Sequence, residues 1–248
     1  MAVQPAYETM GRVYAATRGE DPRIARSIRD ALDDVESVVN IGAGTGSYEP
    51  PDLRVVAVEP SPTMIAQRPP DAAPVHQGVA EMLPLVDGEV DAALAVLTTH
   101  HWDDLPRALA EMRRVARRRA VILTCDPDAA DMWLYRDYFP SFLTNARVSL
   151  PRLDEYAPLG DLTIVRVPIP RDCRDGFAAA YWARPEAYLD PVCRANISGF
   201  HLLSRSELHD GLQRLRADLQ SGDWQRKHGP GSRQTLDCGY RLVVADFD

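Results

Sequence analysis

The feature that most constrains the fold is an apolar run, residues 38–41, that ends directly in a glycine-rich turn, residues 42–46. A short apolar run bounded by glycines is typical of a strand buried on both faces. The three glycines let the backbone turn sharply and let a ligand approach it closely. In sheets of parallel strands, ligands bind just beyond the carboxyl ends of the strands. We therefore predict a buried parallel strand that ends in a ligand-binding loop.

Strand-like and helix-like segments alternate through the first half of the chain. Strands are predicted at residues 38–41, 54–58, around Val75, 91–97 and 120–124. Helices are predicted to begin at Asp21-Pro22, at Ser61-Pro62 and at about Asp104. Asp and Ser cap helices, and proline suits the first helical position. Alternating strands and helices indicate a parallel sheet that is covered by helices on both faces.

Two late apolar segments, residues 162–167 and 240–245, are expected to complete this sheet with an antiparallel edge. The stretches 128–160 and 169–238 are too long to be plain connections, so we expect them to form a helical cap over the strand ends. The predicted fold is α/β, a doubly wound, mostly parallel seven-stranded sheet with a cap. Residues 1–127 form the cofactor-binding part of the core, and residues 128–248 supply the remaining strands and the cap.

Composition argues against nucleic acid and membranes as partners. The formal net charge is −8, whereas phosphate binding needs clustered basic residues. A group of arginines within residues 113–119 is interpreted as a solvated helix end, where cations are favourable. No apolar run reaches membrane-spanning length, and the first ten residues lack the pattern of a signal peptide. Four widely spaced cysteines indicate reduced thiols, so we expect a cytoplasmic protein.

Two residues narrow the kind of ligand. Glu59 ends the second predicted strand, where a carboxylate can accept hydrogen bonds from ribose hydroxyls. The dinucleotide fingerprint needs its third glycine at position 47, but this chain has Ser47. A nucleoside-containing cofactor without a pyrophosphate is therefore favoured, and a nicotinamide dehydrogenase is the less favoured alternative.

Three motifs in order carry a family resemblance: residues 39–46, residues 58–64 with Glu59 and Met64, and residues 80–84. Together they resemble class I S-adenosylmethionine-dependent methyltransferases, which have a Rossmann-like methyltransferase fold. The helical segment 109–115 is similar to the small-molecule group that includes the ubiquinone and menaquinone C-methyltransferases. The resemblance covers residues 7 to about 127.

The resemblance implies that S-adenosylmethionine is the cofactor. It implies that the glycine loop lies against the methionine part, that Glu59 holds the ribose and that Met64 packs on the adenine. Ala80 and Glu81 would lie at the adenine amine, and an N-terminal tyrosine, Tyr7 or Tyr14, would cover the cofactor. The implied cofactor-binding residues are Tyr14, Asn40, Gly42, Ala43, Gly44, Glu59, Pro60, Met64, Ala80, Glu81, Val96 and Leu97.

Position 40 departs from the family pattern. The family usually has Asp or Glu there, and Asn40 lacks the charge that attracts the ammonium of the cofactor. This departure leaves open a cofactor-binding protein that transfers no methyl group, because fold does not imply function.

His100 and His101 follow the fourth predicted strand and are the candidate catalytic residues. Histidine is a suitable general base near neutral pH. Alternatively, one of the pair packs against or caps the next helix. A metal site that adds Asp126 and His201 is disfavoured, because the usual histidine spacings are absent, so no metal is expected.

Aromatic residues between 132 and 139 either form core or line a substrate site. A small, partly apolar acceptor would suit such rings. We therefore expect methyl transfer to a small organic molecule by a monomer or a homodimer, with the methylated atom undetermined.

Overall fold

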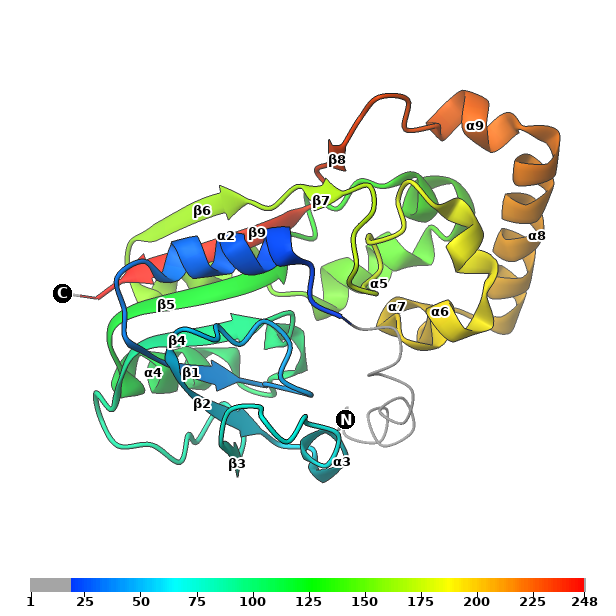
Figure 1. The fold of residues 1–248 in the computed structure, drawn as a ribbon. Coiled ribbons are helices and arrows are strands. Elements are labelled where there is room, and N and C mark those ends of the chain that lie inside the picture. Colours follow the sequence, from blue (N-terminus) through cyan, green and yellow to red (C-terminus); the bar gives the residue numbers. More distant parts are fainter. Residues whose placement is uncertain (1–18, 248) are drawn as a thin grey trace.

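The computed structural model describes residues 19–247, which form a sheet with helices on both faces (Figure 1). The strands of the main sheet are β1 (Ser37–Ile41), β2 (Arg54–Glu59), β3 (Val75–Gln77), β4 (Val90–Val96), β5 (Ala116–Cys125), β6 (Leu162–Arg166) and β9 (Tyr240–Asp246). Their order is β3-β2-β1-β4-β5-β9-β6. Neighbouring strands from β3 to β5 are parallel, and β9 is antiparallel to both β5 and β6. The predicted doubly wound, mostly parallel seven-stranded sheet is confirmed.

The central strands are apolar because both of their faces are covered. Successive residues of a strand point to opposite faces. Accordingly, Val38 and Leu94 belong to the hydrophobic cluster beneath α2 (Pro22–Leu32), while Val39 and Ala93 belong to the cluster beneath α4 (Leu105–Val115). All five residues of β1 are buried. This packing fixes the end of β1, and with it the position of the glycine loop.

The three predicted helix starts are confirmed. The Asp21 carboxylate accepts a hydrogen bond from the Arg23 amide (3.0 Å) at the start of α2. Asp104 caps α4 in the same way, accepting from the Arg107 amide (3.1 Å). Ser61 caps α3 (Pro62–Ile65), which is a single turn. These caps satisfy amide groups that a helix start otherwise leaves unpaired.

The two late strands complete one side of the sheet with antiparallel pairings, as the sequence predicted. β9 is inserted between β5 and β6, and β6 forms the edge. All but the last residue of β9 are buried, whereas every residue of β6 after Leu162 is exposed. The difference follows from composition, because β9 has a continuous apolar run from Leu242 to Ala245, whereas β6 carries the polar residues Thr163 and Arg166 on opposite faces.

Two insertions form the helical cap beyond the carboxyl ends of the strands (Figure 1). The first contains η2 (Leu134–Tyr138) and α5 (Ser141–Ser149), and η3 (Leu153–Leu159), which follows them, packs on the α4 face of the sheet. The second follows the two-residue strand β7 (Ile169–Pro170), which pairs with β8 (Thr235–Leu236), and contains η4 (Pro185–Leu189), α6 (Pro191–Ala195), α7 (Ser198–His201), α8 (Arg205–Ser221) and α9 (Asp223–His228). The predicted cap is confirmed, while the functional division at residue 127 stays a prediction.

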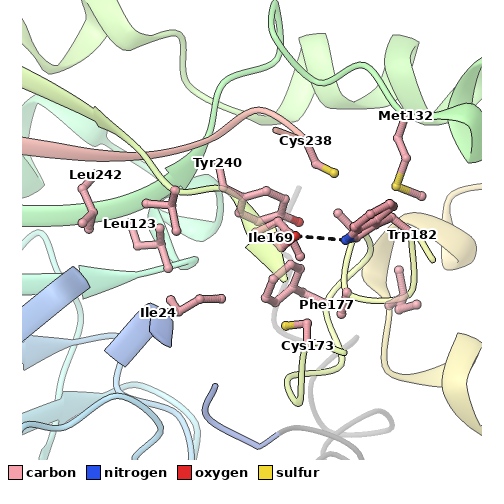
Figure 2. Close-up of a cluster of buried hydrophobic side chains, with 14 of the residues drawn as sticks. Ile24, Leu123, Met132, Ile169, Cys173, Phe177, Trp182, Cys238, Tyr240 and Leu242 are labelled. Atoms are coloured by element: carbon pink, nitrogen blue, oxygen red, sulfur yellow. Dashed lines mark hydrogen bonds between the residues drawn. The ribbon is translucent and has the colours of Figure 1, made fainter. Parts of the chain in front are cut away.

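The core of the cap is continuous with one face of the sheet. Figure 2 shows Leu123 and Tyr240 of the sheet near Phe177 and Trp182 of the cap. The rings of Phe177 and Tyr240 have their centroids 4.7 Å apart. The Trp182 indole donates hydrogen bonds to the carbonyl groups of β7, so this large side chain is anchored as well as buried. The cap is therefore rigidly attached to the sheet where β5 and β9 meet.

The arginine cluster is only in part the helix end that the sequence suggested, because Arg113 and Arg114 alone lie in the last turn of α4. Arg117, Arg118 and Arg119 lie on β5, because that strand begins earlier than predicted. Each pairs with a carboxylate, as in Arg117 with Asp91 (2.5 Å). The positive charge of these three arginines is thus paired locally with carboxylates. Within residues 19–247, no helix is both long and apolar enough to cross a membrane.

Candidate active site

The glycine loop follows β1 with left-handed backbone angles that favour glycine. Gly42, Gly44 and Gly46 have φ values of 68°, 54° and 98°. The amides of Gly42 and Ala43 both donate to the Val58 carbonyl oxygen (2.8 and 3.1 Å), which holds the loop against the end of β2. A β-carbon at position 42 would lie 2.1 Å from the Thr98 hydroxyl oxygen. Position 42 therefore has no room for a side chain, so only glycine fits there.

Glu59 lies at the end of β2 and is 6% exposed. One carboxylate oxygen accepts a hydrogen bond from the Gly44 amide (2.8 Å), and the other accepts one from the Ser61 amide (2.9 Å). Burial raises the pKa of this carboxyl group, while the two amides and the Arg68 charge oppose the rise. Each oxygen of an ionised carboxylate can accept more than one hydrogen bond. Glu59 thus joins the glycine loop to β2 and retains acceptor capacity for a ligand.

Of the predicted adenine residues, Met64 lies beside the same loop. Met64 is buried, and its methyl carbon would meet a β-carbon added at Gly44 at 3.4 Å. Ala80 is also buried. One carboxylate oxygen of Glu81 accepts hydrogen bonds from the amides of Asp103 and Asp104, so Glu81 binds the segment that leads into α4.

The chain leaves β4 through a strained residue. Leu97 has a φ of 51°, an uncommon conformation for a residue with a branched side chain. Its amide donates to the Leu123 carbonyl oxygen (2.8 Å), so the neighbouring strand β5 holds the strained backbone in place. Such strain costs roughly 1–3 kcal/mol and is concentrated at functional sites. Val96 and Leu97 thus lie at the carboxyl end of β4, and their position at the reacting end of the cofactor stays a prediction.

His100 and His101 lie on the short helix η1 (Thr99–His101), directly after this kink. Their ring centroids are 3.8 Å apart. Burial lowers the pKa of His101 to about 4, so this imidazole is neutral at physiological pH and can accept a proton. The preceding residue, Thr99, is fixed by a hydrogen bond between its hydroxyl and the buried Tyr156 hydroxyl (2.7 Å). The predicted catalytic pair is thus positioned by a buried contact with η3.

The low pKa of His101 predicts an acid-sensitive fold. Protonation below pH 6.5 favours the unfolded chain, so the contribution of neutral His101 is complete above pH 6.5 and is lost as the pH falls toward 4. Replacing His101 by Gln should remove this loss, which is about 2–3 kcal/mol of unfolding free energy between pH 7 and pH 4.5. Urea unfolding at the two pH values measures it. His76→Gln, at an exposed site on β3, is the matched control; an equal pH dependence in all three proteins would contradict the prediction.

The aromatic stretch in the first insertion is core. Every side chain at the positions considered is buried: Met132, Trp133, Leu134, Tyr135, Tyr138 and Phe139. The Trp133 ring packs edge-on against Tyr138 and Tyr188, with centroids 5.7 Å apart in both pairs. These rings stabilise the cap, so of the two interpretations left open by the sequence, the structure supports core.

The candidate metal ligands do not come together. Among residues 19–247, no group of three or more His, Cys, Asp or Glu side chains is arranged to hold a metal ion. The His201 ring lies against the Ala195 carbonyl oxygen (2.9 Å) within the cap. The four cysteines are free thiols, and burial raises the pKa of Cys173 to about 12, which makes a nucleophilic role unfavourable. Tyr7 and Tyr14 lie outside the described residues.

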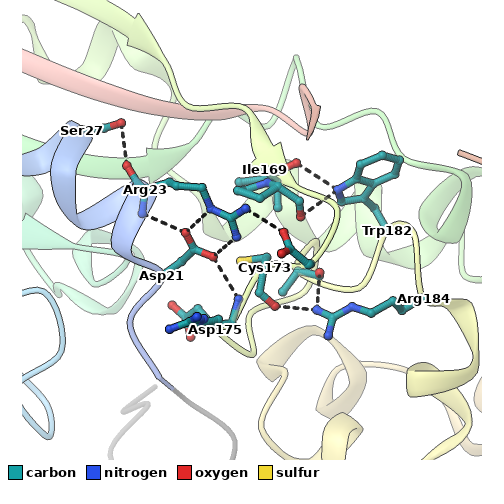
Figure 3. A network of polar contacts seen from close by, with 12 residues as sticks. Asp21, Arg23, Ser27, Ile169, Cys173, Asp175, Trp182 and Arg184 are labelled. Carbon is teal, nitrogen blue, oxygen red and sulfur yellow. Dashed lines mark hydrogen bonds and ion pairs between the residues drawn. The ribbon is translucent and has the colours of Figure 1, made fainter. Parts of the chain in front are cut away.

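Sequence reasoning missed a polar network that begins at Tyr48, directly after the glycine loop. The Tyr48 hydroxyl donates to Asp175 (2.9 Å) and accepts from the Asp21 amide (3.3 Å). The Asp21 carboxylate, which is fully buried, binds Arg23 and the Arg174 amide (Figure 3). The network joins the cofactor loop, the start of α2 and the cap. Its partners are distant in sequence, so no local pattern indicates them.

A second missed group is a buried ion pair behind the glycine loop. The Arg68 guanidinium donates to both carboxylate oxygens of Glu49 (2.8 and 2.9 Å). Glu49 also accepts a hydrogen bond from the Asn40 side-chain amide (3.2 Å). The nearness of Glu49 to the glycines in the sequence was an available indication, but nothing in the sequence placed Arg68 beside it.

Comparison with known proteins agrees with the fold and with the loop geometry. Residues 39–124 match the model of a methyltransferase domain. A candidate methyltransferase from an antibiotic biosynthesis pathway of Anabaena variabilis is 36% identical, with a TM-score of 0.85, over 93% of this chain and 99% of that chain. Geranyl diphosphate C-methyltransferase from Streptomyces coelicolor, solved with S-adenosylhomocysteine, has a TM-score of 0.51 at 18% identity over 91% and 77% of the two chains, which shows a shared fold.

Curated relatives match over a shorter region. An uncharacterized methyltransferase of Mycobacterium tuberculosis is 42% identical over 88 residues, or 32% of this chain. The match spans about a third of that relative's length, 35%. The sheet order, the glycine loop and Glu59 define a Rossmann-like methyltransferase fold. With the full-length similarity to the Anabaena protein, they show that the chain belongs to the class I S-adenosylmethionine-dependent methyltransferases.

Proposed function

We propose that this protein transfers the methyl group of S-adenosylmethionine to a small organic molecule. The observation that carries the proposal is the joint geometry of the glycine loop and Glu59, which lie together at the carboxyl ends of β1 and β2. Parallel sheets bind their ligands at this edge. The family uses S-adenosylmethionine, and the residues present fit that cofactor.

Three features support the fit. Glu59 retains acceptor capacity for ribose hydroxyls. Gly42 and Gly44 allow the sharp turn that leaves the loop backbone at the carboxyl end of β1. Asn40 is 1% exposed, and its side-chain oxygen has no hydrogen-bond partner among the described residues. A buried acceptor without a donor is unfavourable, and the ammonium of the methionine part would supply one. Met64, Pro60, Ala80 and Glu81 are proposed to surround the adenine, with Tyr14 covering the cofactor.

The bound sulfonium supplies an activated methyl group, so the protein's task is to orient the acceptor and exclude water. Leu97 and Val96 define one wall of the reacting end, and the strained backbone at Leu97 directs the chain into η1. His100 and His101 are then placed beside the acceptor. Neutral His101 accepts a proton from acceptors that must lose one, and it is a weak base because burial lowers its pKa.

The cap is proposed to enclose the acceptor, with residues 128–248 providing the cover and residues 1–127 the cofactor site. The pathway named for the Anabaena relative, antibiotic biosynthesis, uses small organic substrates and supports an acceptor of that kind. We further propose a cytoplasmic monomer or homodimer with no nucleic acid or membrane partner. The formal charge of −8 supports the absence of nucleic acid.

Calorimetric titration tests the cofactor assignment. We expect S-adenosylmethionine and S-adenosylhomocysteine to bind with micromolar or tighter dissociation constants, and NADH not to bind. Failure of both nucleosides to bind would overturn the proposal, and binding of NADH alone would favour a dehydrogenase. Release of S-adenosylhomocysteine with a library of small acceptors then separates a methyltransferase from a protein that only binds the cofactor. Activity that requires an added metal ion after chelation would contradict the expectation that no metal is used.

A further inference from the structure

We propose that Glu49 and Arg68 are positioning residues for the cofactor, acting through Asn40. The inference rests on the proposed function and concerns the same site. The Glu49–Arg68 pair fixes which atom of the Asn40 amide is available to a ligand, and it supports the glycine loop from behind. No local sequence motif indicates the pair, and its two members are brought together only by the fold.

The pair is buried, which makes it unusual among the ion pairs of this protein. The side chain of Arg68 is 4% exposed and that of Glu49 is 9% exposed, whereas each other Arg–carboxylate pair within residues 19–247 has at least one partner that is clearly more exposed. Burying two charges is costly, and replacing such a pair by apolar residues is often neutral or stabilising. Stability alone is therefore a weak reason for its presence, and its contacts indicate a specific role.

Those contacts lie on the end of β1, on the cofactor loop and on the segment before β3. Arg68 donates to the Gly44 carbonyl oxygen (3.3 Å) and to the Ala73 carbonyl oxygen (3.1 Å). A β-carbon added at Gly46 would lie 3.3 Å from the guanidinium and 3.4 Å from a Glu49 oxygen. The loop thus rests directly on the pair. Gly44 is also the residue whose amide binds Glu59, so the pair and Glu59 hold the two peptide groups that flank this residue.

The contact with Asn40 determines the orientation of its amide. An ionised carboxylate only accepts hydrogen bonds, so the NH₂ group of Asn40 must face Glu49. The oxygen of Asn40 is then the atom left without a partner. A neutral residue at position 49 could accept or donate, and the amide could reverse. Arg68 holds the Glu49 carboxylate in place by donating to both of its oxygens.

For binding, this orientation means that the side-chain oxygen of Asn40 faces the ammonium group of the cofactor. With its oxygen presented, Asn40 can accept a hydrogen bond from the ammonium of the methionine part. With its NH₂ group presented, it would place a donor against a donor. The carboxylate that usually stands at position 40 is thus replaced by a neutral amide, and Glu49, nine positions along, fixes that amide in the accepting orientation.

Three variants test the proposal: Glu49→Gln, Arg68→Met and the double variant. For each, the dissociation constant of S-adenosylhomocysteine is measured by calorimetry and the melting temperature without ligand by circular dichroism. We expect each single variant to bind more than tenfold more weakly and to melt at a lower temperature, because one buried charge loses its partner. In the double variant no unpaired charge remains, so the melting temperature should recover while binding stays at least fivefold weaker.

A purely structural pair would behave differently. If binding in the double variant recovered together with the melting temperature, or if the single variants bound as tightly as the wild type, the proposal would be overturned. Arg118→Met is the matched control, because Arg118 pairs with the exposed Asp34 at the opposite end of β1; its binding should be unchanged. Failure of the wild-type protein to bind S-adenosylhomocysteine would instead overturn the proposed function, so the two failures are distinguishable.

Discussion

Replacing Gly42 by Ala is expected to weaken the binding of S-adenosylhomocysteine by at least a hundredfold. The new β-carbon would lie 2.1 Å from the Thr98 hydroxyl oxygen and 2.9 Å from the Thr98 β-carbon. Both contacts are far inside van der Waals distance, and φ is 68°, where a side chain adds further strain. The loop must therefore move away from β4, and the amide groups of Gly42 and Ala43 would leave the Val58 carbonyl oxygen.

Gly44→Ala is the matched control, because it isolates the effect of the backbone angle. Its φ of 54° is equally unfavourable for a side chain, but a β-carbon there meets only the flexible end of Met64, at 3.4 Å. A left-handed residue other than glycine costs roughly 1–2 kcal/mol, so we expect about a tenfold loss. Calorimetry measures the affinity of both variants for S-adenosylhomocysteine, and circular dichroism verifies that both are folded. Equal losses would show that contact with Thr98 does not limit the loop.

The fold could be predicted from the sequence because its strongest determinants are local. The end of β1 is marked by the change from an apolar run to glycine, and the start of α2 is marked by Asp21 before proline. Strand β9 was placed in sequence but not in the sheet, because the order of strands depends on packing between distant segments. Its uniformly buried pattern is the property that puts it inside the sheet and leaves β6 at the edge.

The candidate site could be predicted only where one residue acts within its own segment. Glu59 and the glycines are of this kind, since each follows a recognisable strand. Tyr48 and Arg68 are not, because their partners lie far along the chain and are joined only by the fold. The aromatic residues of the cap remained ambiguous for a related reason: periodicity does not distinguish a core between helices from the lining of a site.

The second large effect is expected at Glu59. In Glu59→Ala, the hydrogen bonds to the ribose hydroxyls would be lost, and the Gly44 and Ser61 amides would lose their acceptor. A hydrogen bond to a charged group contributes about 1.5–3 kcal/mol, so two of them correspond to a hundredfold or greater weakening of S-adenosylhomocysteine binding. Glu36→Ala, at an exposed position before β1, should bind as the wild type does. Wild-type affinity in Glu59→Ala would remove the main support for the cofactor site.

The pH dependence of binding separates the charge of Glu59 from its shape. Because burial raises the pKa of this carboxyl group, binding that needs the ionised form is present above the raised pKa and is lost as the pH falls through it. The loss should begin at a higher pH than an ordinary glutamate would give. Glu59→Gln keeps the shape but cannot titrate, so its weaker binding should vary less between pH 7 and pH 5. If both proteins lost affinity in parallel, the titrating group would lie elsewhere, and Glu59 would bind the ribose without its charge controlling affinity.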